Sequence, residues 1–243
     1  MWLLILACTG DSADSGPAAV DTASTAVDDT AAPSDDTGEP DLGPEDGFGE
    51  LSGDCGGLDS VALSGGFSSV WNTLDFGDTT YDPSLLSEGG QEIIADGNAG
   101  GSSLESEAIA FDVLYRCEGA ALLATETEVE YIDDGGKKID LLVDLAGLQV
   151  GVSVTRAYGY PPDDPYTVEQ ATDLLVDKLS DLQDIEQNVD DTHRFDARAL
   201  HVLAYTPDHA ESLRTALDEL DEATLGAATL VVTVTEGDDA FLY

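Results

Sequence analysis

The stretch 138-KIDLLVDLAGLQVGVSVTR-156 decides the fold class. Its apolar residues fall into two runs on either side of Ala146-Gly147, a dipeptide that suits a tight turn between paired strands. The pattern therefore predicts two antiparallel strands, over residues 138–145 and 148–156. An earlier run over 122–131 ends at the turn sequence Asp133-Asp134-Gly135-Gly136, so we expect a three-stranded meander.

Helical spacing of apolar residues appears on both sides of the meander. Ser102 and Glu105 form an S-x-x-E pattern typical of a capping box, which predicts a helix from there to about Cys117. Thr167 and Gln170 predict the cap of a long helix that runs to about Val189. Beyond it the pattern predicts three more elements: a strand over 199–205, a helix over 209–223 and a strand over 229–235.

The expected order from residue 102 is therefore α-β-β-β-α-β-α-β. It describes an α/β domain over 102–243, in which the three-stranded meander plus two further strands form a mixed sheet flanked by helices. Residues 53–101 carry weaker patterns, and we expect them to supply one or two strands or an irregular N-terminal lobe of the folded domain. The motifs of nucleophile elbows, zincins, NTPases, dinucleotide-binding folds and zinc ribbons do not occur in the sequence.

The N-terminus predicts export. Residues 1–7 are an apolar run that ends in Ile5-Leu6-Ala7-Cys8, which resembles the lipobox of bacterial lipoproteins. The resemblance implies a signal peptide over 1–7, cleavage before Cys8 and a membrane anchor through lipid on that cysteine. Thr9 follows the cysteine in place of an Asp, which by the same resemblance favours the outer membrane over the inner membrane. The run departs from a normal signal peptide because it is short and has no Lys or Arg.

Residues 8–52 are predicted to be the lipidated cysteine and an acidic, disordered tether. They repeat Asp, Ser, Thr, Ala and Pro without a periodic apolar pattern, so they cannot bury enough surface to offset the entropy of ordering. Lipidation of Cys8 leaves Cys55 and Cys117 as a pair in an oxidising compartment, where a disulfide is the expected state. Two unpaired thiols remain the alternative, because spacing alone does not prove proximity.

The net charge limits the choice of partners. The chain has 51 Asp and Glu against 8 Lys and Arg, which gives a formal net charge of −43. Nucleic acid is an unfavourable partner, because a nucleic-acid surface must place several cations against phosphates. Solubility in a salty habitat is the simplest explanation of this acidity.

Side chains alternate along a strand, so the meander can present a polar face. Asp140 and Asp144 share one face of the second strand, Ser153 and Thr155 one face of the third, and Glu126, Glu128 and Glu130 one face of the first. A solvated sheet surface is the alternative explanation for the three glutamates. Two helical charges, Glu107 and Lys178, fall on or beside apolar stripes, and we expect Lys178 to pair with Asp140 because a buried charge requires a partner.

This arrangement resembles the core of the PD-(D/E)XK, restriction-endonuclease-like superfamily over about residues 102–205. The resemblance implies a nuclease-like domain in which Asp140 and Glu107 bind Mg²⁺. Glu128, on the polar face of the meander, is a further candidate ligand, and Ca²⁺ is the alternative ion. The Glu-x-Lys position of the family reads Ser153-Val154-Thr155 here, so one metal ligand and one water-positioning cation are missing. Lys178 is the candidate replacement for that cation.

Three functions follow as hypotheses. The first is an envelope-anchored lipoprotein with a divergent, non-catalytic nuclease-like domain that binds a protein or small-molecule partner at the cell surface. The second is a Mg²⁺-dependent hydrolase of phosphodiesterase type, with Asp140, Glu107 and Lys178 at its centre and Ser153 and Thr155 beside them. The third is a structural envelope component.

Overall fold

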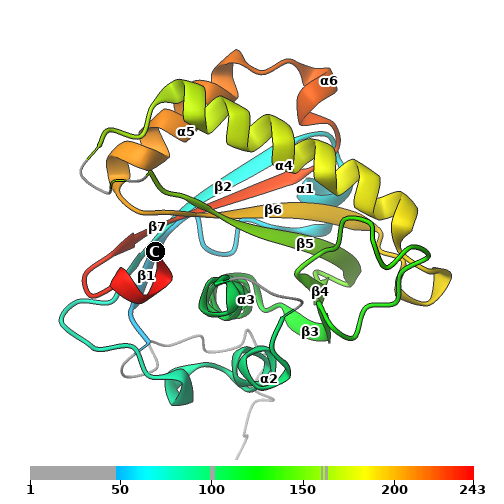
Figure 1. The fold of residues 1–243 in the computed structure, drawn as a ribbon, viewed down its shortest axis with the longest axis horizontal. Helices are drawn as coiled ribbons and strands as arrows, with labels where there is room; N and C mark the ends of the chain where they lie inside the picture. The colour runs from blue at the N-terminus through cyan, green and yellow to red at the C-terminus, as the bar shows by residue number, and fades with distance from the viewer. Residues whose placement is uncertain (1–47, 99–101, 160, 162–163) are drawn as a thin grey trace, which may run out of the picture. The chain divides into compact units, whose positions relative to one another are not determined.

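The computed structural model describes residues 48–98, 102–159, 161 and 164–243, and its centre is a seven-stranded mixed sheet. The strands are β1 (Glu50–Gly53), β2 (Ser68–Asp75), β3 (Ala121–Thr125), β4 (Leu141–Leu145), β5 (Leu148–Ala157), β6 (Ala197–Ala204) and β7 (Thr229–Glu236). The longer helices are α2 (Glu88–Asp96), α3 (Leu104–Glu118), α4 (Val168–Asn188) and α5 (Pro207–Glu219), and the short ones are α1 (Ser60–Ser64), α6 (Glu222–Leu225), η1 (Pro83–Leu85), η2 (Asp191–His193) and η3 (Ala240–Leu242). Helices α4 and α5 cover one face of the sheet and α2 and α3 the other (Figure 1). The predicted α/β class with a mixed sheet is confirmed.

The strand order is β1-β2-β7-β6-β5-β4-β3. Strands β3, β4 and β5 form the predicted antiparallel meander, and β5, β6, β7 and β2 then run parallel. Parallel pairing requires crossovers, which α4 supplies between β5 and β6 and α5 supplies between β6 and β7. Strands β5, β6 and β7 are almost wholly buried, as expected of strands that carry helices on both faces.

The turn at the centre of the meander forms as predicted. Ala146 and Gly147 have φ angles of 53° and 78°. A two-residue hairpin whose two central residues both have positive φ is of the type I′ class, which matches the twist of the strands that it joins. The turn fixes the register, with Leu141 opposite Val152 and Leu145 opposite Leu148.

Of the two predicted helix caps, one is confirmed and one is wrong. Thr167 and Gln170 form a complete capping box at the start of α4. At α3 the N-cap is Ser103, and its side chain makes no capping bond. The Ser103 hydroxyl donates instead to Glu107, so the expected Ser102–Glu105 box does not form.

The region before residue 102 is better ordered than expected. Residues 50–53 and 68–75 are strands of the same sheet, and β2 pairs in parallel with β7 along its whole length. Of the two alternatives expected for residues 53–101, strands or an irregular lobe, the structure shows a strand, β2, in the central sheet, together with the helices α1, η1 and α2. The folded region also begins inside the predicted 8–52 tether, because Phe48 is buried and β1 begins at Glu50. The signal peptide, Cys8 and the rest of the tether lie outside the described residues.

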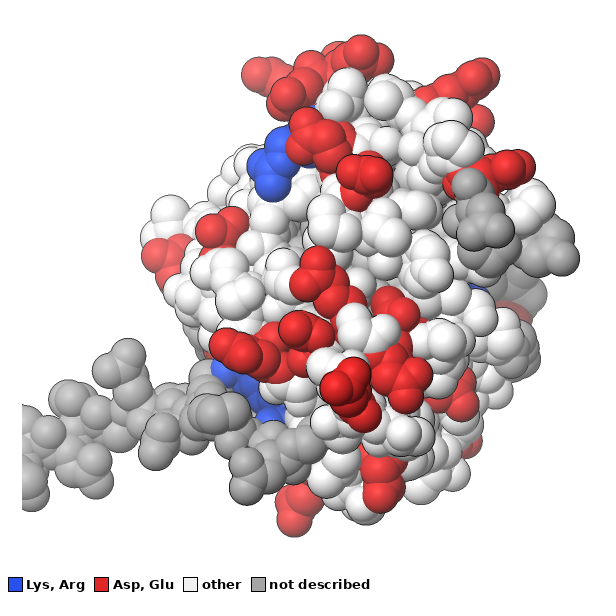
Figure 2. Space-filling view, turned by 90° about the vertical axis from the view of Figure 1, so that its left-hand side faces the viewer, with Lys and Arg blue, Asp and Glu red and all other residues white. Residues whose placement is uncertain are grey.

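Cys55 and Cys117 lie at disulfide distance, with Cα atoms 4.5 Å apart, as expected. The surface is strongly acidic, and one face carries many Asp and Glu side chains with few Lys or Arg (Figure 2). In the described ranges, no helix combines the length and the apolar character needed to cross a membrane.

Candidate functional site

Three carboxylates meet where the N-terminal half of α3 approaches the meander. Each of Glu107, Glu126 and Asp140 offers one oxygen atom, and these atoms all lie within 4.8 Å of one another. We call these three residues the inner carboxylate cluster. Glu107 comes from α3, Glu126 from the turn after β3, and Asp140 from the residue before β4.

Asp140 is held in position by backbone groups of β5. Its backbone N–H donates to the carbonyl of Val152 at 2.9 Å, as a ladder residue does, and its Oδ2 accepts the N–H of Val154 at 2.5 Å. The side chain thus takes the place that a backbone carbonyl would occupy in a longer strand. For this reason β4 begins at Leu141 and not at Lys138 as expected.

The bend at Asp140 also changes the faces of the strand. Strict alternation along the strand would place Ile139 on the same face as Leu141 and Val143. It packs instead in the α4-side cluster with Leu142, while Leu141 and Val143 pack in the α3-side cluster. The simple alternation of side chains fails at the residue whose carboxylate replaces a backbone partner.

Glu107 is almost fully buried, with 2% of its surface exposed. Its Oε1 accepts hydrogen bonds from Ser103 Oγ at 2.7 Å and Asn98 Nδ2 at 3.1 Å. Asn98 Nδ2 also lies 3.1 Å from Ser103 Oγ, so the two donors brace each other. Among the described residues, both hydrogen bonds to Glu107 use the same oxygen, Oε1.

Glu126 reaches the cluster because the first strand is shorter than predicted. Strand β3 ends at Thr125, and the following residues form a turn in which Glu128 N and Val129 N donate to the Thr125 carbonyl. The Glu128 carboxylate accepts the Thr125 N–H at 3.1 Å and closes this turn. A Thr-Glu repeat thus binds its own backbone and leaves the ladder, so Glu126, Glu128 and Glu130 do not line a strand.

The electrostatics of the inner cluster disfavour full ionisation. Burial raises the pKa of Asp140 to about 7, against the lowering effect of the Val154 N–H, and the Glu107 and Glu126 charges raise it further. Burial also raises the pKa of Glu107, which the hydrogen bonds from Ser103 and Asn98 oppose. Like charges this close cannot all be ionised without compensation. A proton or a bound cation provides it.

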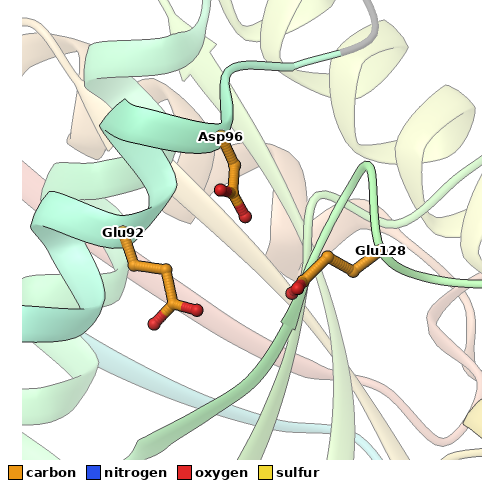
Figure 3. Close-up of side chains that lie close together, drawn as sticks. All are labelled: Glu92, Asp96 and Glu128. Atoms are coloured by element: carbon orange, nitrogen blue, oxygen red, sulfur yellow. The ribbon is translucent and has the colours of Figure 1, made fainter.

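A second group of acidic residues lies beside the first. Glu92 and Asp96 project from α2 toward Glu128 of the turn (Figure 3), with oxygen atoms again within 4.8 Å of one another. Thr125 links the group to the sheet through a hydrogen bond from its Oγ1 to Asp96 at 3.1 Å. All three acids are exposed, so water solvates them and their geometry requires no cation. We call them the outer carboxylate cluster.

The predicted site residues thus separate into two sets. Asp140 and Glu107 come together, and the nearby Ser153 side chain lowers the pKa of Asp140 against the larger effect of burial. Glu128 lies in the outer cluster, and Thr155 is half-buried on β5, on the same side of that strand as Ser153.

Lys178 does not join the site. It lies on α4, which packs on the sheet face opposite α3 (Figure 1), and among the described residues it forms no ion pair with Asp140. Lys178 is half-buried beside the apolar stripe of Leu175, Leu179 and Leu182. A lysine in such a position covers apolar surface with its stem while its ammonium group stays in water, so it requires no buried partner.

The positions of Glu126, Asn98 and Ser103 in this site were not predicted from the sequence. Glu126 was expected on a strand, and the signal for its turn is the Thr-Glu-Thr-Glu repeat at 125–128, whose side chains can hydrogen-bond nearby backbone groups. Asn98 follows α2 at a distance of nine residues from Glu107, which no local pattern connects.

The donor set has clear chemical preferences. Three carboxylates without nitrogen or sulfur ligands suit a hard divalent cation, and both Mg²⁺ and Ca²⁺ are bound by oxygen ligands of this type.

Comparisons with known proteins give little on this domain. No family model matches the chain, and no solved structure matches it. A Dictyostelium discoideum protein described as "AAC-rich mRNA clone AAC4 protein" is 45% identical over 101 residues, which is 39% of this chain and 15% of that protein. The chain thus spans a small part of that relative, and the similarity assigns no family.

Proposed function

We propose that this chain is a lipid-anchored bacterial envelope protein whose α/β domain binds a divalent cation at the inner carboxylate cluster and acts by binding at the cell surface. The convergence of Glu107, Glu126 and Asp140 carries the proposal. The cluster is partly to fully buried, and burial raises the pKa values of Asp140 and Glu107, so a bound cation would relieve the repulsion between their charges.

A binding role is favoured over hydrolysis for two reasons. The Glu-x-Lys position of the nuclease-like superfamily is Ser153-Val154-Thr155, and Lys178 lies on the other face of the sheet. Neither of these two positions therefore supplies a lysine that could position an attacking water. The acidic surface also repels nucleic acid.

One observation supports the second candidate, a Mg²⁺-dependent phosphodiesterase. Asp140 and the helix residue Glu107 meet as the resemblance to the superfamily implies. A different cation, Arg156, lies on the α3 side of β5 and donates to Ser102 Oγ at 3.5 Å, just before the helix that carries Glu107. In such an enzyme the metal would polarise a phosphodiester and lower the pKa of bound water.

Calorimetric titration of Mg²⁺, Mn²⁺ and Ca²⁺ into the full chain tests the cation site. We expect binding by the unmodified protein, loss of binding in Asp140→Asn, and normal binding in Glu92→Gln, a matched change in the outer cluster. Equal binding by all three proteins, or loss only in Glu92→Gln, would move the site elsewhere. Absence of binding by the unmodified protein would remove it.

Two further measurements separate the functions. Turnover of a simple phosphodiester in Mg²⁺ or Mn²⁺ that disappears in Asp140→Asn would establish the hydrolase in place of the binding role. Mass spectrometry of native protein tests the anchor, for which we expect an acylated N-terminal Cys8 without residues 1–7. An unmodified Cys8 that follows an intact leader would exclude it.

A further inference from the structure

The chain enters the folded domain at β1, a short strand at the edge of the sheet. Strand β1 has four residues, three of them exposed, and it pairs with a single neighbour, β2. Just before it, the Phe48 ring lies 4.1 Å from the guanidinium carbon of Arg116 and packs edge-on against Phe76. Any tension applied to residues 1–47 reaches the domain at this point, because the chain is continuous there.

A covalent bond follows almost immediately. Cys55 stands two residues after β1 and is joined to Cys117 in the last turn of α3. Next to it, the Glu118 carboxylate accepts the N–H groups of Gly56 at 3.0 Å and Leu58 at 2.9 Å. The segment after β1 is thus fastened to the end of α3 by one covalent bond and two charge-assisted hydrogen bonds.

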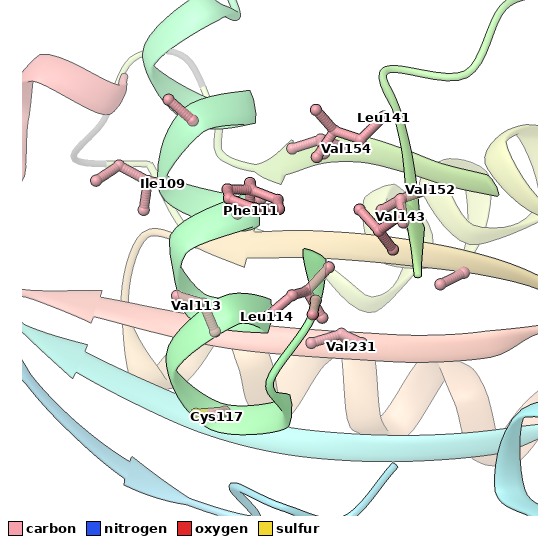
Figure 4. Close-up of a cluster of buried hydrophobic side chains, with 14 of the residues drawn as sticks. Ile109, Phe111, Val113, Leu114, Cys117, Leu141, Val143, Val152, Val154 and Val231 are labelled. Carbon is pink, nitrogen blue, oxygen red and sulfur yellow. The ribbon is translucent and has the colours of Figure 1, made fainter. Parts of the chain in front are cut away.

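Helix α3 packs tightly into the core on its side of the sheet. Its side chains Ile109, Val113 and Leu114 are fully buried, in one cluster with the strand residues Val143, Val152 and Val231 (Figure 4). Cys117 lies at the end of this buried face with 6% of its surface exposed. A load that reaches Cys55 passes to α3 and the packed core, and it bypasses α1 and β2, which come next in the chain.

We propose that the Cys55–Cys117 disulfide is a mechanical stop that confines tension on the N-terminal tether to β1. Peeling of β1 would release residues 48–54 and then end at the bond, so strands β2 to β7 and the inner carboxylate cluster would stay intact under load. The biological use of the stop rests on the proposed lipid anchor, since a load arises when Cys8 is held and the domain is held by a partner. The mechanical property itself does not depend on lipid.

Single-molecule pulling on the purified full chain, with handles at its two ends, tests the proposal. For the oxidised protein we expect a first, low-force step of about seven residues, roughly 25 Å, and a separate step at higher force for the rest of the domain. For Cys55→Ser with Cys117→Ser, we expect the first step to continue past residue 55 into β2. The total extension should also increase by roughly 200 Å, because residues 55–117, which the disulfide had kept from extending, can now be stretched.

Two controls keep the test decisive. Leu51→Ala, which removes a partly buried contact of β1, should lower the force of the first step and leave its length unchanged. If the serine variant does not fold, the folded native protein pulled in a phosphine reductant replaces it. A single step that releases β1 together with the rest of the oxidised domain would overturn the proposal, as would an identical short first step with and without the bond. Because lipid is absent from this assay, its failure leaves the anchor and the cation site untouched.

Discussion

Replacement of Asp140 by Asn should make the stability of the domain less sensitive to a rise in pH from 5 to 8. The pKa of Asp140 is raised from 3.8 to about 7 in the fold, mainly by burial. Between these two values the unfolded chain has lost the proton and the folded chain keeps it, so stability falls as the pH rises toward 7. Below the unfolded value no such loss occurs, and above about pH 7 the loss is complete.

The magnitude follows from the shift. At 1.36 kcal/mol for each tenfold change in proton affinity, a rise from 3.8 to about 7 corresponds to roughly 4 kcal/mol, of which about 3 kcal/mol falls between pH 5 and pH 8. Asn has nearly the same shape, and its carbonyl oxygen can accept the Val154 N–H as the carboxylate does. The variant therefore removes the ionisation and retains the hydrogen bond.

Urea denaturation at pH 5 and pH 8 in the presence of a chelator measures the effect. The stability difference between Asp140→Asn and the native protein should move by about 3 kcal/mol in favour of the variant at pH 8. Asp173→Asn, which removes an exposed carboxylate from α4, serves as the control for net charge and should move by much less. Equal behaviour of the two variants would refute the reasoning, because it would place the Asp140 charge in ordinary solvent.

Three further results are expected. Serine at both Cys55 and Cys117 removes a link across a sequence separation of 62, which should lower the free energy of unfolding by about 4 kcal/mol in denaturant; a loss under about 1 kcal/mol would contradict the loop-entropy argument. Thr167→Ala breaks the capping box of α4 and should cost about 1 kcal/mol by the same assay, whereas a change at the half-exposed Thr172 should cost less. Because the net charge is −43, 1 M NaCl should raise the Tm by screening self-repulsion, and a Tm that does not depend on salt would show that the charges are too far apart to matter.

The regular part of the fold could be predicted because each of its elements carries a local signal. The turn at Ala146-Gly147 lies between two apolar runs, and the Thr167–Gln170 cap precedes a clear helical stripe. Strand β2 could not be placed in the sheet, because its pairing with β7 depends on residues about 160 positions later in the chain, and β1 joins the sheet only through β2. Periodicity reports the face of an element and not its neighbour.

The candidate site was predicted only in part for a related reason. Asp140 and Glu107 were identified from their positions on a strand and a helix, and the structure brings them together. The third acid, Glu126, depends on a turn stabilised by side chains, and this turn ends a strand that the alternation of residues had extended to Tyr131. Lys178 was misplaced because a charge beside an apolar stripe was taken to be buried, whereas a long side chain can reach water from there.

Cation binding at the inner carboxylate cluster can be tested by diffraction from a crystal of the full chain soaked in Mn²⁺, with data collected at a wavelength where manganese scatters anomalously. We expect an anomalous peak within bonding distance of oxygen atoms of Glu107, Glu126 and Asp140, and no peak there in Asp140→Asn. A peak only at Glu92, Asp96 and Glu128, or none in the native protein at saturating Mn²⁺, would contradict it.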